Sequence, residues 1–110
     1  MSRRARSPLL LLLAVTSPAL LSLGACKART FDSYMESGDR YAKAGKFAEA
    51  AIEYRGAVLK DPSSGPARLK LGQAYEEHRE FPKAAQEYIN AADLMPTNIE
   101  AQLKARACTC

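Results

Sequence analysis

Few side chains in this sequence could act as nucleophiles, general bases or metal ligands. Its 110 residues include one histidine, His78, and three cysteines, Cys26, Cys108 and Cys110. Cys108 and Cys110 stand at the end of the chain, so neither a Cys-His nor a Ser-His-Asp arrangement can be placed. These two thiols could form a strained disulfide or half of a soft-metal site, but no histidine lies near them. We therefore expect no enzyme, no cofactor and no metal site.

The remaining candidates for acid-base chemistry are clustered carboxylates in the segment "YEEHRE". Glu76, Glu77 and Glu80 surround His78 there. Charged helix faces commonly have this composition, so we interpret the cluster as a solvated helix end, with His78 exposed.

Cys26 follows a leader that has the three parts of a secretory signal. A basic head ("MSRRAR") precedes an apolar segment at residues 8–23, and the small residues Gly24 and Ala25 come directly before the cysteine. The basic head stays on the cytoplasmic side of a membrane while the apolar segment enters it. The leader therefore predicts export.

The motif "LGAC" at residues 23–26 resembles the lipobox of bacterial lipoproteins. The resemblance implies cleavage after Ala25, a diacylglycerol thioether on Cys26 and acylation of the new amine. Two or three acyl chains make a stable membrane anchor. We accordingly expect a signal peptide at 1–25 and a lipidated cysteine with a short tether at 26–30.

Three other interpretations of the leader remain open. The apolar segment approaches the length of a membrane-spanning helix, although Pro18 would kink it. The start "SRRAR" contains a twin arginine but lacks the apolar residues that normally follow in that export signal. Cys26 could also be a bystander behind an ordinary signal peptide.

The formal net charge of +4 does not indicate a nucleic-acid partner. Three of the 16 Lys and Arg residues precede Cys26, whereas all 12 Asp and Glu residues follow it. The chain beyond the leader is close to neutral, and it lacks the clustered basic face that phosphate binding requires.

An internal repeat with a period of 34 residues organises the rest of the chain. Windows 31–64 and 65–98 are identical at Gly38 and Gly72, Tyr41 and Tyr75, Phe47 and Phe81, Ala50 and Ala84, Ala51 and Ala85, Glu53 and Glu87, Tyr54 and Tyr88, Ala57 and Ala91, and Pro62 and Pro96. Ala101, Leu103 and Lys104 begin a partial third unit at 99–110. Arg106 and Thr109 break its pattern, so we expect the chain to end within a repeat.

Each window predicts two helices. Apolar and small residues recur at three- and four-residue steps in "FDSYMESGDRYAKAG" and again in "KFAEAAIEYRGAVLKDP". Gly45 is a stop signal between them, and Pro62 ends the second. The second window repeats this from Pro66 to His78 and from Phe81 to Met95. Glycine inside a helix is costly, so Gly38 and Gly72 indicate close approach of a neighbouring helix.

These small, aromatic and proline positions resemble the tetratricopeptide repeat (TPR). The signature is met by Tyr34, Gly38, Tyr41, Ala50, Tyr54, Ala57 and Pro62, and then by Leu71, Gly72, Tyr75, Ala84, Tyr88, Ala91 and Pro96. Arg68 departs from it, because the family often has an aromatic residue there. The resemblance implies an all-α fold of about two and a half helical hairpins, stacked as a right-handed superhelix.

The resemblance further implies that the first helices line a concave groove for protein or peptide segments. The groove positions would be Asp32, Met35, Asp39, Ala42 and Lys43, with Pro66, Leu69, Gln73, Glu76, Glu77, Glu100 and Leu103 in the later units. Leu69 and Leu103 could instead pack between repeats. Repeats that clamp the acidic C terminus of cytosolic chaperones use basic and amide groups, which Met35 and Asp39 do not supply. The groove instead suits a segment with apolar and basic or amide groups.

Together, the motifs predict a non-enzymatic scaffold held by lipid on Cys26 in the bacterial envelope, in assembly, export or polysaccharide secretion. Lys27 follows the lipidated position, and absence of Asp there favours the outer membrane, facing the periplasm. Repeat lipoproteins associated with exopolysaccharide and PEP-CTERM sorting systems have a similar layout. An alternative is the anchored front of a larger envelope enzyme or transport component, and a third is a short lipoprotein that self-associates.

Overall fold

The computed structural model describes residues 27–108. The predicted signal peptide, the predicted lipidation site at Cys26 and the terminal Cys110 lie outside the described residues. Within the described part, helices are joined by short turns and no strand occurs, which confirms the predicted all-α repeat fold.

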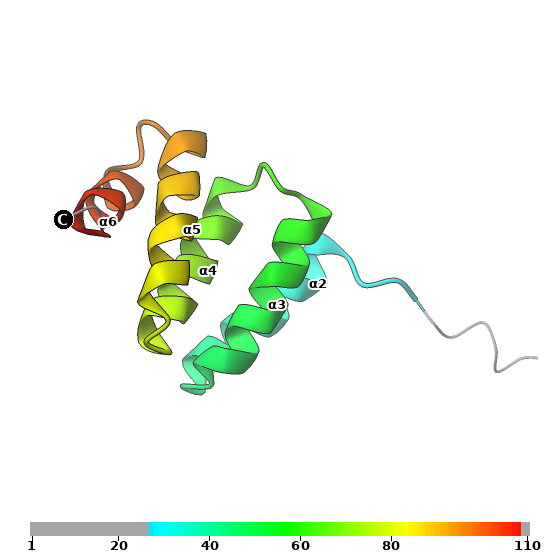
Figure 1. Cartoon of the computed structure of the whole chain (residues 1–110). Helices are drawn as coiled ribbons and strands as arrows, with labels where there is room; N and C mark the ends of the chain where they lie inside the picture. The colour runs from blue at the N-terminus through cyan, green and yellow to red at the C-terminus, as the bar shows by residue number, and fades with distance from the viewer. Residues whose placement is uncertain (1–26, 109–110) are drawn as a thin grey trace, which may run out of the picture.

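Between residues 27 and 108, the helices follow one another as stacked hairpins (Figure 1). In chain order they are α2 (Phe31–Lys43), α3 (Phe47–Lys60), α4 (Gly65–Glu77), α5 (Phe81–Leu94) and α6 (Ile99–Cys108). Helices α2 and α3 form one hairpin, α4 and α5 form the next, and α6 packs against α5. Tertiary contacts run mainly between helices that are consecutive in the chain, as in other stacked repeats.

The first helix of each unit begins at a polar cap, and these caps stand 34 residues apart. In each, a side-chain oxygen accepts a hydrogen bond from the backbone N–H three residues later, at 3.2 Å for Thr30, 3.2 Å for Ser64 and 3.0 Å for Asn98. Such a cap satisfies one of the N–H groups that the helix start leaves unpaired. The repeat therefore extends to the helix starts, although Thr, Ser and Asn are not identical residues.

The two helices of each hairpin are joined by a turn with one residue in the left-handed backbone region. That residue is Gly45 in the first hairpin, at φ 73°, and Arg79 in the second, at φ 64°. The amide that follows each one donates to a carbonyl of the preceding helix, that of Tyr41 at 2.9 Å and that of Tyr75 at 2.8 Å. Glycine adopts this conformation freely, whereas Arg79 is strained by about 1 kcal/mol. Gly45 lies just after the end of α2 in the left-handed conformation that glycine favours, which agrees with its prediction as a helix stop.

Glycine allows the helices of each hairpin to approach closely, as predicted. A Cβ atom on Gly38 would lie 2.4 Å from the ring of Tyr54, and one on Gly72 would lie 2.7 Å from the ring of Tyr88. Both rings are buried, with Tyr88 fully so. In each hairpin, the tyrosine ring therefore packs directly against the backbone at the glycine of the other helix.

Most other buried positions also carry small side chains. The described core contains Ala50, Ala51, Ala57, Ala67, Ala74, Ala84, Ala91, Ala92 and Ala101, together with Leu69, Leu71 and Tyr75. Small side chains bring the helix axes close together and leave the tyrosine rings to fill the remaining space.

The departure from the family pattern at Arg68 has a structural reason. In the first unit the ring of Tyr34 covers Gly56, where a Cβ atom would lie 2.4 Å away. Arg68 and Asn90 replace this pair 34 residues later. The Arg68 guanidinium then donates to Glu87, with Nη1 and Oε2 2.9 Å apart. In the second unit, the ion pair between Arg68 and Glu87 of α5 therefore takes the place of the contact between the Tyr34 ring and Gly56.

Glu87 has a counterpart in the first unit, Glu53, whose cationic partner is a residue that precedes α2. Arg29 pairs with Glu53, and its guanidinium lies 4.1 Å from the ring centre of Tyr34. The hydrogen bond from Arg29 lowers the pKa of Glu53. These contacts hold Arg29, which precedes α2, against the first hairpin.

Candidate binding groove

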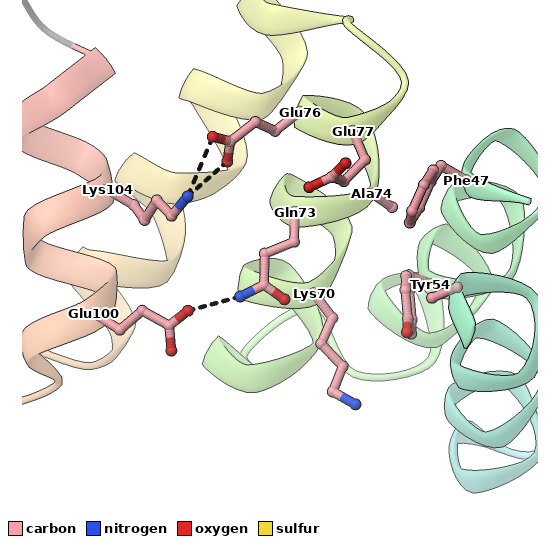
Figure 2. Close-up of a pocket in the computed structure, with 10 residues that line it drawn as sticks. Phe47, Tyr54, Lys70, Gln73, Ala74, Glu76, Glu77, Glu100 and Lys104 are labelled. Atoms are coloured by element: carbon pink, nitrogen blue, oxygen red, sulfur yellow. Dashed lines mark hydrogen bonds and ion pairs between the residues drawn. The ribbon is translucent and has the colours of Figure 1, made fainter. Parts of the chain in front are cut away.

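A groove of about 330 Å³ lies between the first hairpin, α4 and α6 (Figure 2). We call it the concave groove; its walls are formed by Ala42, Phe47, Tyr54, Lys70, Gln73, Ala74, Glu76, Glu77, Glu100 and Lys104. Helices α2, α4 and α6 supply most of these residues, while α3 supplies Phe47 and Tyr54. Its walls therefore combine an apolar part next to the first hairpin with a charged part between α4 and α6.

Some of the predicted groove residues line this groove and others do not. Gln73 and Glu76 are on its wall, together with Ala42, Glu77 and Glu100. Leu69 is buried in the core, with 8% of its surface exposed, and Met35 packs against that core. The structure therefore gives Leu69 and Met35 packing positions.

The remaining predicted positions lie outside the groove wall. Asp32, Lys43 and Pro66 are exposed, as is Leu103 on α6. Asp39 is half-buried and does not line the groove, but it accepts hydrogen bonds from two wall residues, Tyr54 and Lys70.

Sequence reasoning missed Phe47, Tyr54, Lys70, Ala74 and Lys104 as wall residues. The family pattern predicts groove residues on the first helix of each unit, whereas Phe47 and Tyr54 belong to α3. The two lysines carried a usable signal, because Lys70 and Lys104 recur at the period of 34 and on the first helices.

A three-residue contact joins the first two units beside the groove. The Tyr54 hydroxyl donates to Asp39 Oδ1 at 2.7 Å, and Lys70 Nζ of the next unit donates to the same oxygen at 2.5 Å. Partial burial alone would raise the pKa of Asp39, but the bonds from Lys70 and Tyr54 outweigh it, so this pKa is lowered. Burial and the bond to Asp39 raise the pKa of Tyr54.

The same contact recurs between the second and third units. Tyr88 donates its hydroxyl to Glu76, and Lys104 Nζ lies 2.9 Å from Glu76 Oε2. These bonds, from Tyr88 first and then from Lys104, lower the pKa of Glu76. Burial and the bond to Glu76 raise the pKa of Tyr88. The lysine of each later unit thus binds a carboxylate of the unit before it.

Two further carboxylates of the wall have a different environment. Glu100 accepts a hydrogen bond from the Gln73 amide at 2.8 Å, as Figure 2 shows. Glu77 is exposed at the end of α4 and lines the groove together with Ala74 and Phe47. Among residues 27–108, neither glutamate forms a salt bridge. The groove therefore carries negative charge that its own lysines do not neutralise.

His78 and Cys108 are not part of the groove wall, whereas Glu76 and Glu77 of the same carboxylate cluster are. His78 is exposed, and its Nδ1 is 3.1 Å from Glu80 Oε1. Cys108 is a free, exposed thiol. In the described part of the chain, no group of three or more His, Cys, Asp and Glu side chains is arranged to hold a metal ion. None of the helices formed by residues 27–108 combines the length and the apolar character needed to cross a membrane.

Stacked hairpins with an open, mixed-polarity groove define an all-α helical-repeat protein. A family model described as tetratricopeptide repeat matches residues 35–99, which is more than half of the chain, and the chain belongs to this family. No curated protein matched the chain. The TPR domain is a non-catalytic interaction fold that typically binds protein or peptide partners.

Proposed function

We propose that this protein is a membrane-anchored scaffold that binds segments of partner proteins in the concave groove. The observation that carries the proposal is the groove itself, where an apolar part at Phe47 and Ala74 adjoins hydrogen-bonding groups at Gln73 and Glu100. An extended segment offers side chains of both kinds and backbone groups that such walls can bind.

We further propose that the anchor is lipid on Cys26 and that the scaffold works in the bacterial envelope, on the periplasmic side of the outer membrane. This rests on the "LGAC" motif, the leader before it and Lys27 after it. Two or more acyl chains are needed for stable attachment. Envelope assembly, export or polysaccharide secretion would be the setting.

Site-specific photo-crosslinking in intact cells tests the binding role. A photoreactive residue replaces Gln73 in the groove or, as the matched control, the exposed Gln86 on α5. We expect discrete protein adducts from position 73 that position 86 does not form. Identical adducts from both positions, or none from position 73 in a folded protein, would contradict a binding groove.

Labelling with radioactive palmitate tests the anchor separately. We expect label on the natural chain and none on Cys26→Ser, with the variant released from the membrane fraction. Label that persists on Cys26→Ser would show that the lipid is attached to another residue and would contradict the proposed anchor.

A further inference from the structure

We infer that the concave groove selects segments that carry arginine or lysine side chains, with Glu77 and Glu100 as the groups that bind them. This inference rests on the proposed function and assigns the chemistry of its partner. It follows from the pairing of charges in the groove, from the apolar surface next to Glu77 and from the hydrogen bond that orients Glu100.

Every lysine on the groove wall already has a carboxylate of its own. Lys70 binds Asp39 at 2.5 Å, and Lys104 binds Glu76 at 2.9 Å. Both lysines also lie near tyrosine rings, with Lys70 6.0 Å from the centre of Tyr54. These cations are held between repeats, so an acidic ligand would have to compete with the protein's own carboxylates.

On the groove wall, the two carboxylates that form no salt bridge within residues 27–108 are open to an incoming segment. Glu77 and Glu100 are both exposed on the groove wall. Gln73 donates to one oxygen of Glu100 at 2.8 Å, which restricts the side chain and leaves the other oxygen available. A phosphate or carboxylate ligand would meet like charge here, whereas a cationic side chain would meet an opposite charge.

The surface next to Glu77 suits the rest of a long basic side chain. Ala42, Phe47 and Ala74 line the groove together with Glu77, and Figure 2 shows Ala74 between the Phe47 ring and the Glu77 carboxylate. The methylene groups of arginine or lysine pack on such surfaces while the charged group reaches a carboxylate. Arginine should bind more tightly than lysine, because its planar guanidinium pairs with a carboxylate through two donors and also stacks on a ring.

Fluorescence anisotropy with defined probes tests the inference on the full chain, purified from membranes in a non-ionic detergent. The probe is a short fluorescein-labelled peptide of glycine, alanine and leucine that carries arginines. Matched probes carry glutamine or glutamate at the same positions. We expect the arginine probe to bind more tightly than the glutamine probe, and the glutamate probe to bind least.

Glu77→Gln and Glu100→Gln should each weaken binding of the arginine probe by about two- to fivefold, the effect of one partly exposed ion pair. Neither change should alter binding of the glutamine probe. Glu49→Gln is the matched control, because Glu49 is exposed on α3 outside the groove and the change removes the same charge. Circular dichroism checks that each variant keeps the helical content of the natural chain.

Several results would overturn the inference and leave the proposed function intact. Equal binding of the arginine and glutamine probes, or equal losses in Glu49→Gln and Glu77→Gln, would show that these carboxylates do not select the partner. If Glu77→Gln changes the sedimentation of the purified protein, its oligomeric state depends on Glu77, and the groove is occupied by a second copy of the chain. If no probe binds and position 73 also forms no crosslink, the proposed function fails together with the inference.

Discussion

Tyr88 donates its buried hydroxyl to Glu76 on the neighbouring helix. The corresponding Tyr54 donates to Asp39, which stands one helical turn earlier in its own unit than Glu76 does. Exact repetition would have required Gln73 to receive the bond from Tyr88. The contact is therefore preserved in space, although its acceptor has moved along the helix, which is possible because i and i+3 lie on one helix face.

Removing this hydroxyl should destabilise the fold. We expect Tyr88→Phe to lower the free energy of unfolding by about 1 kcal/mol, the usual net worth of one hydrogen bond in a folded protein. Urea denaturation followed by circular dichroism measures it. Tyr75→Phe is the control, because no hydrogen bond of the Tyr75 hydroxyl is seen in residues 27–108 although its ring is buried. An equal loss in both variants would contradict a role for the bond to Glu76.

Gly72 should not tolerate even one methyl group. Gly72→Ala places a Cβ atom 2.7 Å from the ring of Tyr88, so we expect a loss of about 1–3 kcal/mol in spite of the better helix propensity of alanine. The same urea experiment measures the loss. Combining Gly72→Ala with Tyr88→Leu should make the alanine less costly than it is alone. Full additivity of the two changes would mean that the ring is not the cause.

Relieving the backbone strain at residue 79 should stabilise the second hairpin. Arg79 has φ 64° where the first hairpin has Gly45, so Arg79→Gly should raise the free energy of unfolding by about 0.5–1 kcal/mol. Arg79→Ala keeps a Cβ atom in the same conformation and should bring no such gain. The urea midpoints of the two variants distinguish relief of strain from loss of the arginine charge.

Acid should weaken the contacts between repeats. The pKa values of Asp39 and Glu76 are lowered in the folded chain, so their contribution to stability is fully present above their ordinary values of 3.8 and 4.5. It is lost as the pH falls through the lowered values, and stability should therefore drop progressively below about pH 5. Thermal unfolding over that range measures the drop.

The share of this pH dependence that comes from Glu76 can be measured with Glu76→Gln. Glu76→Gln should be less stable than the natural chain near neutral pH and should lose less on acidification. Glu49→Gln, which removes an exposed carboxylate outside the groove, should follow the natural chain. The same acid response in all three proteins would exclude Glu76 as a source.

Arg68 and Asn90 of the second unit should be replaceable by the tyrosine and glycine of the first unit only when both are changed together. Arg68→Tyr alone places a ring against Asn90 and removes the cation from Glu87, so we expect it to cost about 1 kcal/mol or more. Adding Asn90→Gly recreates the bare backbone that Tyr34 covers at Gly56. The double-mutant cycle should show a favourable coupling of about 0.5 kcal/mol or more, and a coupling of zero would contradict the comparison.

Much of the fold could be predicted because its signals are local. Small residues at helical spacing, Gly45 at a turn and Pro62 after a helix act on the few residues around them, and a period of 34 shows that the same unit returns. The caps at Thr30, Ser64 and Asn98 were also visible in principle, since all three types serve as helix caps.

The groove could be predicted less well, because each wall residue depends on how one hairpin is rotated against the next. The family resemblance allows Leu69 either in the groove or packed between repeats, and it lies in the core. Phe47 belongs to the second helix of its unit and still lines the groove. Periodicity indicates that a residue is on an apolar face but does not say which of two neighbouring helices covers it.

By itself, the sequence determined the helices, their order and the glycines on which tyrosine rings lie, because these follow from backbone preferences and from the volume of each side chain. Only the tertiary structure decided which charges meet. Lys70 binds Asp39, which is 31 residues away in the sequence, and Lys104 binds Glu76, which is 28 residues away, because stacking of the repeats brings these side chains together. The resulting pairs leave Glu77 and Glu100 without a salt bridge in residues 27–108, and that outcome depends on distances in space that no spacing along the chain encodes.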